Sequence, residues 1–75
     1  MGTDELLKRI GIRISYIRKL RKLDQEELAT KVGITRSYMS KVESANGIDG
    51  VPLSLYIRIA EALEVEAWKI FRIDE

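Results

Sequence analysis

The chain has 75 residues, of which 45% are hydrophobic and 33% are charged, and its formal net charge is +1. This length allows one small domain with a modest core, and the composition is that of a globular protein rather than a disordered one. Because the chain contains neither Cys nor His, disulfides, thiolate metal sites and zinc fingers are excluded, and the commonest general base is missing. We therefore expect no cofactor and no enzymatic activity.

No apolar run approaches the roughly 18 residues of a membrane span, and the first residues, MGTDELLKR, lack a signal-peptide core. We expect a cytoplasmic protein without a membrane partner. The charges are unevenly distributed, because residues 1–41 hold ten Lys and Arg against five Asp and Glu, whereas residues 42–75 hold three against seven. This asymmetry suits a polyanion partner for the basic half, but it also fits ordinary solvated charge.

Helical periodicity dominates the beginning of the chain. Acidic residues at its start and basic residues at its end complement a helix dipole, and the spacing predicts a helix over about 4–22. Its apolar stripe consists of Leu6, Ile10, Ile14, Ile17 and Leu20.

Two short helices are predicted next, each with its own end signals. Asp24 and Glu27 form a capping-box variant, which predicts a helix over 25–32 that ends at Gly33. Thr35 suits the capping position of another helix, over 36–44.

The remainder of the chain predicts a loop and two further helices. Residues 45–52 read ANGIDGVP and favour turns, and Pro52 suits the start of a helix over 53–63. The inward side of this helix is expected to hold Leu53, Tyr56, Ile57, Ala60 and Leu63. A short fifth helix is predicted over 66–72. The expected fold is thus all-α, a single compact five-helix domain over 1–75.

The two central helices are joined by KVGIT, the short Gly-containing turn of a helix-turn-helix over 25–44. The stretch DQEELATKVGITRSYMSKVE resembles the lambda-repressor-like (Cro/C1-type, XRE) family of transcription regulators. The positions that carry this resemblance are Gln25, Leu28, Ala29, Gly33, Ile34, Met39, Val42 and Glu43. The pattern Ile-Ala-x-Ala-Leu-x-Val at 59–65 is similar to the fourth helix of the family. Within the family, TRSYMSKVE is most similar to the controller proteins of restriction–modification systems.

The resemblance implies a sequence-specific regulator that binds double-stranded DNA as a homodimer on a pseudo-palindromic operator. RNA polymerase is a further candidate partner, and the bound protein would be associated with the nucleoid. A phage or plasmid repressor shares most of the pattern, and an antitoxin-like protein-interaction module is the alternative from another functional class. An exposed apolar surface without salt-dependent DNA affinity would favour that alternative.

Site residues follow from the resemblance and from the chemistry of the side chains. Arg36, Ser37 and Lys41 are expected to contact base edges, because Arg binds guanine with two hydrogen bonds. Tyr38 either reaches the DNA with its hydroxyl or covers the seam between the two helices. Phosphate contacts are expected from Gln25, Ser40 and Asn46.

Other positions are expected to be structural. Arg18 and Glu43 match residues that form an ion pair in the family. The segment 53–73 is expected to complete the core and to supply a dimer interface. Candidates for that interface are Leu55, Ile59, Trp68 and Phe71, although these residues could simply close the core.

Two departures from the family pattern stand out. Lys22 occupies a position that is often Gly, so it must avoid a left-handed conformation or bear strain. The loop after Glu43 is two or three residues longer than usual and lacks basic residues, so it offers no cationic side chain for a DNA contact.

Overall fold

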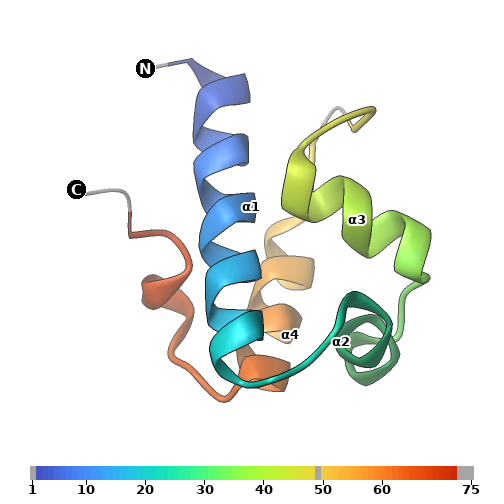
Figure 1. Ribbon diagram of the computed structural model, residues 1–75. Helices are drawn as coiled ribbons and strands as arrows, with labels where there is room; N and C mark the ends of the chain where they lie inside the picture. Colours follow the sequence, from blue (N-terminus) through green and yellow to red (C-terminus); the bar gives the residue numbers. More distant parts are fainter. Residues whose placement is uncertain (1, 49, 73–75) are drawn as a thin grey trace.

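The computed structural model describes residues 2–48 and 50–72, which form four α-helices and one 3₁₀ turn (Figure 1). The helices are α1 (Thr3–Leu20), α2 (Gln25–Val32), α3 (Arg36–Ser44) and α4 (Leu53–Leu63), and the turn is η1 (Ala67–Lys69). Within the described part of the chain there is no strand, and no helix is long and apolar enough to cross a membrane.

The prediction of a fifth helix over 66–72 is wrong, because this segment forms only the three-residue turn η1. Its hydrogen bonds run from the amide groups of Lys69 and Ile70 to carbonyls three residues earlier. Such bonds over three residues build a 3₁₀ turn, which rarely continues beyond three or four residues. The turn instead serves to insert Ile70, which is fully buried, into the core.

The ends of α2 and α3 agree with the prediction because local hydrogen bonds fix them. The Asp24 carboxylate accepts from the backbone N–H of Glu27 at 2.7 Å, and the Glu27 carboxylate accepts from the N–H of Asp24 at 2.9 Å. Gly33 ends α2 with a φ of 90°, a left-handed conformation that glycine adopts without steric strain. Thr35 Oγ1 accepts from the N–H of Tyr38 at 3.0 Å and caps α3.

Helix α1 ends at Leu20, two residues earlier than predicted. Lys22 lies in the left-handed region with a φ of 61°, so of the two predicted possibilities, this residue bears backbone strain rather than avoiding the left-handed conformation. Leu20, the last residue of α1, is 62% exposed and does not belong to the buried stripe.

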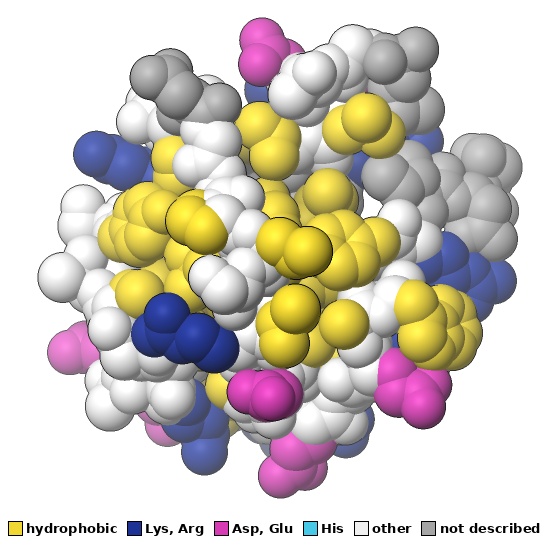
Figure 2. Space-filling model, turned by 180° about the vertical axis from the view of Figure 1, so that it is seen from behind, with side chains coloured by type: hydrophobic (Ala, Val, Ile, Leu, Met, Phe, Trp, Pro, Cys, Tyr) yellow, Lys and Arg dark blue, Asp and Glu magenta, His cyan; other side chains and the backbone are white. Residues whose placement is uncertain are grey.

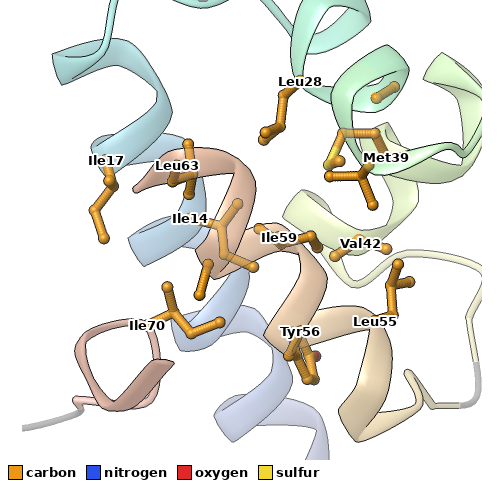
Figure 3. Close-up of a cluster of buried hydrophobic side chains, with 13 residues drawn as sticks. Ile14, Ile17, Leu28, Met39, Val42, Leu55, Tyr56, Ile59, Leu63 and Ile70 are labelled. Carbon is orange, nitrogen blue, oxygen red and sulfur yellow. The ribbon is translucent and has the colours of Figure 1, made fainter. Parts of the chain in front are cut away.

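Every helix and the segment after η1 contribute to one core (Figure 3). The largest side chains with less than 2% exposure are Ile14, Leu28, Met39, Val42, Ile59, Leu63 and Ile70. At one end of this core, Phe71 meets Tyr56 edge to face, with ring centroids 5.4 Å apart. Burial raises the pKa of the Tyr56 hydroxyl, and the proximity of Tyr38 raises it further.

The inward face of α4 differs from the prediction. Leu55 and Ile59 are 4% and 0% exposed, whereas Leu53 and Ile57 are 63% and 40% exposed. Apolar residues cover more than half of this helix, wider than the stripe that one packing face needs, so periodicity alone does not select the buried side. The interface role expected for Leu55 and Ile59 is wrong, because their side chains lie inside the core of the monomer.

Several arginines bind backbone carbonyls at the ends of other elements. Arg13 Nε donates to the carbonyl of Lys69 at 2.9 Å, and Arg21 Nε donates to that of Leu63 at 2.9 Å. Arg58 likewise donates to the carbonyl of Val32, the last residue of α2. These bonds satisfy carbonyls that helix ends leave open. Some of the arginines in residues 1–41 therefore stabilise the fold instead of being available to a polyanion.

Helix α1 approaches α3 closely at Gly11. A Cβ placed on Gly11 would overlap the backbone carbonyl groups of Val42 and Glu43. Backbone atoms cannot move away as a flexible side chain could, so the two helices would have to separate. Glycine is therefore required here by the closeness of the helices and not by its own backbone conformation.

We predict that Gly11→Ala lowers the free energy of unfolding by about 3 kcal/mol, the upper part of the range for overpacked sites. Urea denaturation followed by circular dichroism measures this loss. The matched control is Gly50→Ala, because a Cβ on Gly50 meets no atom within 4 Å. Equal stability of the two variants would contradict the close approach of α1 and α3.

Candidate nucleic-acid interface

Helix α3 presents one polar side to the solvent. Its opposite side packs on the core through Met39 and Val42, which are 0% and 1% exposed. This packing fixes the direction in which the remaining side chains project. The exposed residues of α3 are Arg36, Ser37, Ser40, Lys41 and Ser44. The structure thus places four predicted contact residues on the solvent side of one helix, together with Ser44.

A buried ion pair holds α1 against the end of α3. Arg18 Nε donates to Glu43 Oε2 at 2.8 Å, and Arg18 Nη2 donates to Glu43 Oε1 at 3.1 Å. Both residues are 7% exposed. The third guanidinium nitrogen of Arg18, Nη1, donates to the carbonyl of Leu23 at 2.7 Å. Arg18 therefore lies in the scaffold, and its charge is matched by Glu43.

Gln25, the first residue of α2, is attached to the same pair. Its amide nitrogen Nε2 donates to Glu43 Oε1 at 3.1 Å, and the residue is half-buried. Its backbone N–H belongs to the first turn of α2, where N–H groups have no partner within the helix. Glu43 thus positions Gln25 beside α3, at the helix end where an anion is favoured.

A groove of about 420 Å³ lies between α1, the start of α2 and α3. It brings Gln25 and Ser40 together, two residues for which phosphate contacts are predicted. The prediction did not include the other residues that line the groove. Besides Glu43 they are Ile12, Ser15, Tyr16, Lys19 and Ser44. The polar positions have a spacing that could have revealed them, because Ser15 and Lys19, like Ser40 and Ser44, are separated by four residues on one helix.

Neither Tyr38 nor Asn46 lines this groove. Tyr38 is half-buried and packs against the core, in keeping with a covering role. Asn46 is exposed beyond the C-terminal end of α3, where its N–H donates to Ser44 Oγ at 3.2 Å. Helix α3 has nine residues and a length of about 13 Å, so Arg36 and Asn46 lie at its opposite ends.

The exposed cations of α3 carry uncompensated charge. Among residues 2–48 and 50–72, the salt bridges are Arg9 with Glu5 and Arg18 with Glu43, and neither involves Arg36 or Lys41. The same residues contain no group of three or more His, Cys, Asp or Glu side chains that could hold a metal ion. The outward side of α3 therefore combines hydroxyl groups with unpaired positive charge, which suits an anionic and hydrogen-bonding partner.

Comparison with known proteins finds the same architecture in regulators. The family HTH_3, described as Helix-turn-helix, matches residues 14–67. The restriction–modification controller protein C.AhdI from Aeromonas hydrophila is 31% identical and superposes with a TM-score of 0.86 over 95% of this chain and 100% of that chain.

Two further solved structures are similar. SinR, the master regulator for biofilm formation, was solved in complex with DNA; it is 28% identical with a TM-score of 0.74, over 84% of this chain and 98% of that chain. The hypothetical transcription factor NHTF from Neisseria is 27% identical with a TM-score of 0.83, over 96% of this chain and 82% of that chain. No curated protein sequence matches the chain significantly.

We predict that Arg18→Met lowers the free energy of unfolding by about 3–5 kcal/mol, because it leaves the Glu43 carboxylate buried without its partner. The double variant Arg18→Met/Glu43→Leu should recover most of this loss. Urea denaturation measures both effects. As a control, Arg9→Met breaks the exposed pair with Glu5 and should change stability by less than about 1 kcal/mol. A double variant as unstable as Arg18→Met would refute this account.

Proposed function

Since the chain belongs to the HTH_3 helix-turn-helix family and is a DNA-binding transcription regulator, we propose that it recognises a specific operator through the exposed side of α3. The major groove of B-DNA admits one α-helix and displays a distinct donor and acceptor pattern for each base pair. The main support for the proposal is that α3 exposes a polar, positively charged side, while Met39 and Val42 on its opposite side are buried in the core.

Roles for the individual side chains follow from their positions on α3. Arg36 occupies the first residue of the helix, the end that contacts base edges in helix-turn-helix proteins, and its guanidinium suits guanine O6 and N7. Ser37 and Lys41 read neighbouring positions along the same side. Tyr38 covers the core next to the interface, and its hydroxyl remains a candidate for a DNA contact.

Phosphate contacts complete the proposed interface. Gln25 and Ser40 line one groove and bind the backbone of one strand, which fixes the register of α3 without reading sequence. Asn46 lies just beyond the C-terminal end of α3, where its N–H donates to Ser44, a residue that lines the same groove, and it offers a further phosphate contact at this end of the helix.

A homodimer is proposed because one short helix reads too few base pairs for useful specificity. Helix α4 lies behind α1 and α3 in Figure 1, and the opposite view in Figure 2 shows a broad area of apolar side chains. Leu53, Ile57 and Trp68 are 63%, 40% and 56% exposed, and Phe71 is half-buried. We assign the twofold interface to these four residues, in place of a set that included Leu55 and Ile59.

The likeness to C.AhdI, which covers 95% of this chain, supports a restriction–modification controller as the specific role. RNA polymerase is then a proposed partner at the regulated promoter, with the protein in the cytoplasm and at the nucleoid when bound. A phage or plasmid repressor is the second candidate, because such repressors share most of the helix-turn-helix sequence pattern. An antitoxin-like module would bind a protein through the apolar surface instead, and would show weak DNA binding without sequence preference.

We predict that selection from random duplexes with the wild-type chain yields an inverted repeat, with half-site centres about 34 Å apart. Arg36→Ala should lower discrimination at one base-pair position per half-site by about 5- to 150-fold, the equivalent of 1–3 kcal/mol. Lys31→Ala is the control, because it removes one positive charge from α2 outside the exposed side of α3. Binding that ignores sequence in both the wild type and Arg36→Ala would refute the proposed function.

The dimer is tested by Ile57→Asp, which should raise the dimer dissociation constant at least about 100-fold, because an interface centre tolerates no unpaired charge. Sedimentation equilibrium measures this constant. Leu20→Asp is the matched control: Leu20 is similarly exposed but belongs to α1. If both variants associate like the wild type, Ile57 lies outside the interface.

A further inference from the structure

The groove between α1 and α3 has a composition that the proposed contacts leave unexplained. Two of its walls are the apolar side chain of Ile12 and the ring of Tyr16, which are 66% and 56% exposed. Lys19 and three serine hydroxyls supply hydrogen-bond donors around them. Two large apolar groups exposed in one hollow next to a cation suit a ligand that carries both an apolar and an anionic part.

The charged residues that line the groove indicate which class of ligand it binds. Among the described residues that line the groove, Glu43 provides the only carboxylate. Both of its oxygens accept hydrogen bonds from Arg18, and one also accepts from Gln25, so its charge is compensated. Lys19 has no salt bridge within the described residues. The groove therefore presents uncompensated positive charge together with neutral donors, the chemistry that binds a phosphate.

The position of the groove indicates that the phosphate belongs to a DNA strand. Gln25 and Ser40, the phosphate-binding residues of the proposed interface, also line this groove. A DNA strand bound by these two residues lies next to α1, because residues of α1 line the same groove. Successive phosphates of a strand are separated by a sugar, an apolar ring that matches the exposed side chains of Ile12 and Tyr16.

We propose that the α1 groove is a docking site for the DNA backbone, in which Lys19 pairs with a phosphate while Ile12 and Tyr16 pack against the adjoining deoxyribose. This inference rests on the proposed function and extends it, because it adds a sequence-independent contact by α1 to recognition by α3. Lys19, an exposed cation in the last turn of α1, becomes part of the interface.

The test compares Lys19→Gln with the wild type on two duplexes, the selected operator and a scrambled duplex of equal length. Each phosphate contact contributes about 0.9 to the slope of log K against log salt, so a dimer that loses two contacts should lose about 1.8. The ratio of the wild-type affinity to the Lys19→Gln affinity should consequently fall about 12-fold between 50 and 200 mM salt. Both duplexes should be weakened by the same factor, because a phosphate contact carries no sequence information.

Two matched variants sharpen the result. Lys31→Gln removes the same charge from grooves between α2 and α4, and it should leave the slope unchanged. Tyr16→Ala removes no charge, so it should weaken binding to both duplexes without changing the slope. All these side chains are exposed, and unchanged thermal melting will show that the variants fold.

The outcomes separate this inference from the proposed function. If Lys19→Gln behaves like Lys31→Gln while the wild type still prefers its operator and Arg36→Ala loses that preference, the groove inference is wrong and the proposed function stands. A change in sequence preference in Lys19→Gln would also overturn it, because Lys19 would then read a base. If the wild type binds neither duplex, both proposals fail.

Discussion

The buried pair of Arg18 and Glu43 connects three parts of the molecule through directional polar contacts. It joins α1 to the end of α3, and its outer hydrogen bonds reach the turn after α1 and the first residue of α2. Hydrogen bonds are directional, so they fix the relative orientation of these elements more closely than apolar contacts do. A buried ion pair adds little net stability compared with apolar residues of the same volume. We regard orientation as its main contribution here.

The close packing at Gly11 reinforces this orientation from the same side of α1. Gly11 and Arg18 are separated by two helical turns, and both meet Glu43, the glycine at the backbone carbonyl and the arginine at the carboxylate. The C-terminal end of α3 is thus fixed by two contacts. Its N-terminal end is fixed by the Thr35 cap. The residues proposed to read bases are therefore held before any DNA arrives, which lowers the entropy lost on binding.

The sequence predicts the bounds of α2 and α3 correctly because their ends depend on side chains within a few residues, as the capping box of Asp24 and Glu27 illustrates. Features that depend on distant parts of the chain were predicted less well. The buried face of α4 could not be chosen, since Leu53 and Ile57 are as apolar as Leu55 and Ile59. The partners of Arg13 and Arg21 are carbonyls more than forty residues away, and a carbonyl has no signature in the sequence. In the candidate interface, the exposed residues of α3 could be named from their spacing, whereas the contribution of α1 required knowledge of which helices are neighbours.

The arrangement of the charged residues explains how a chain with a net charge of only +1 can bind a polyanion. Arg13, Arg21 and Arg58 are held by hydrogen bonds to backbone carbonyls, and Arg18 is neutralised by Glu43, so these four side chains are engaged within the fold. The cations that remain effective are those without such partners on α1 and α3. Sequence recognition needs few side chains, but those side chains must be placed accurately against base edges, and contacts to phosphates provide that placement. A small domain therefore gains more from two or three well-positioned cations than from a high net charge, which would raise its affinity for every DNA sequence equally.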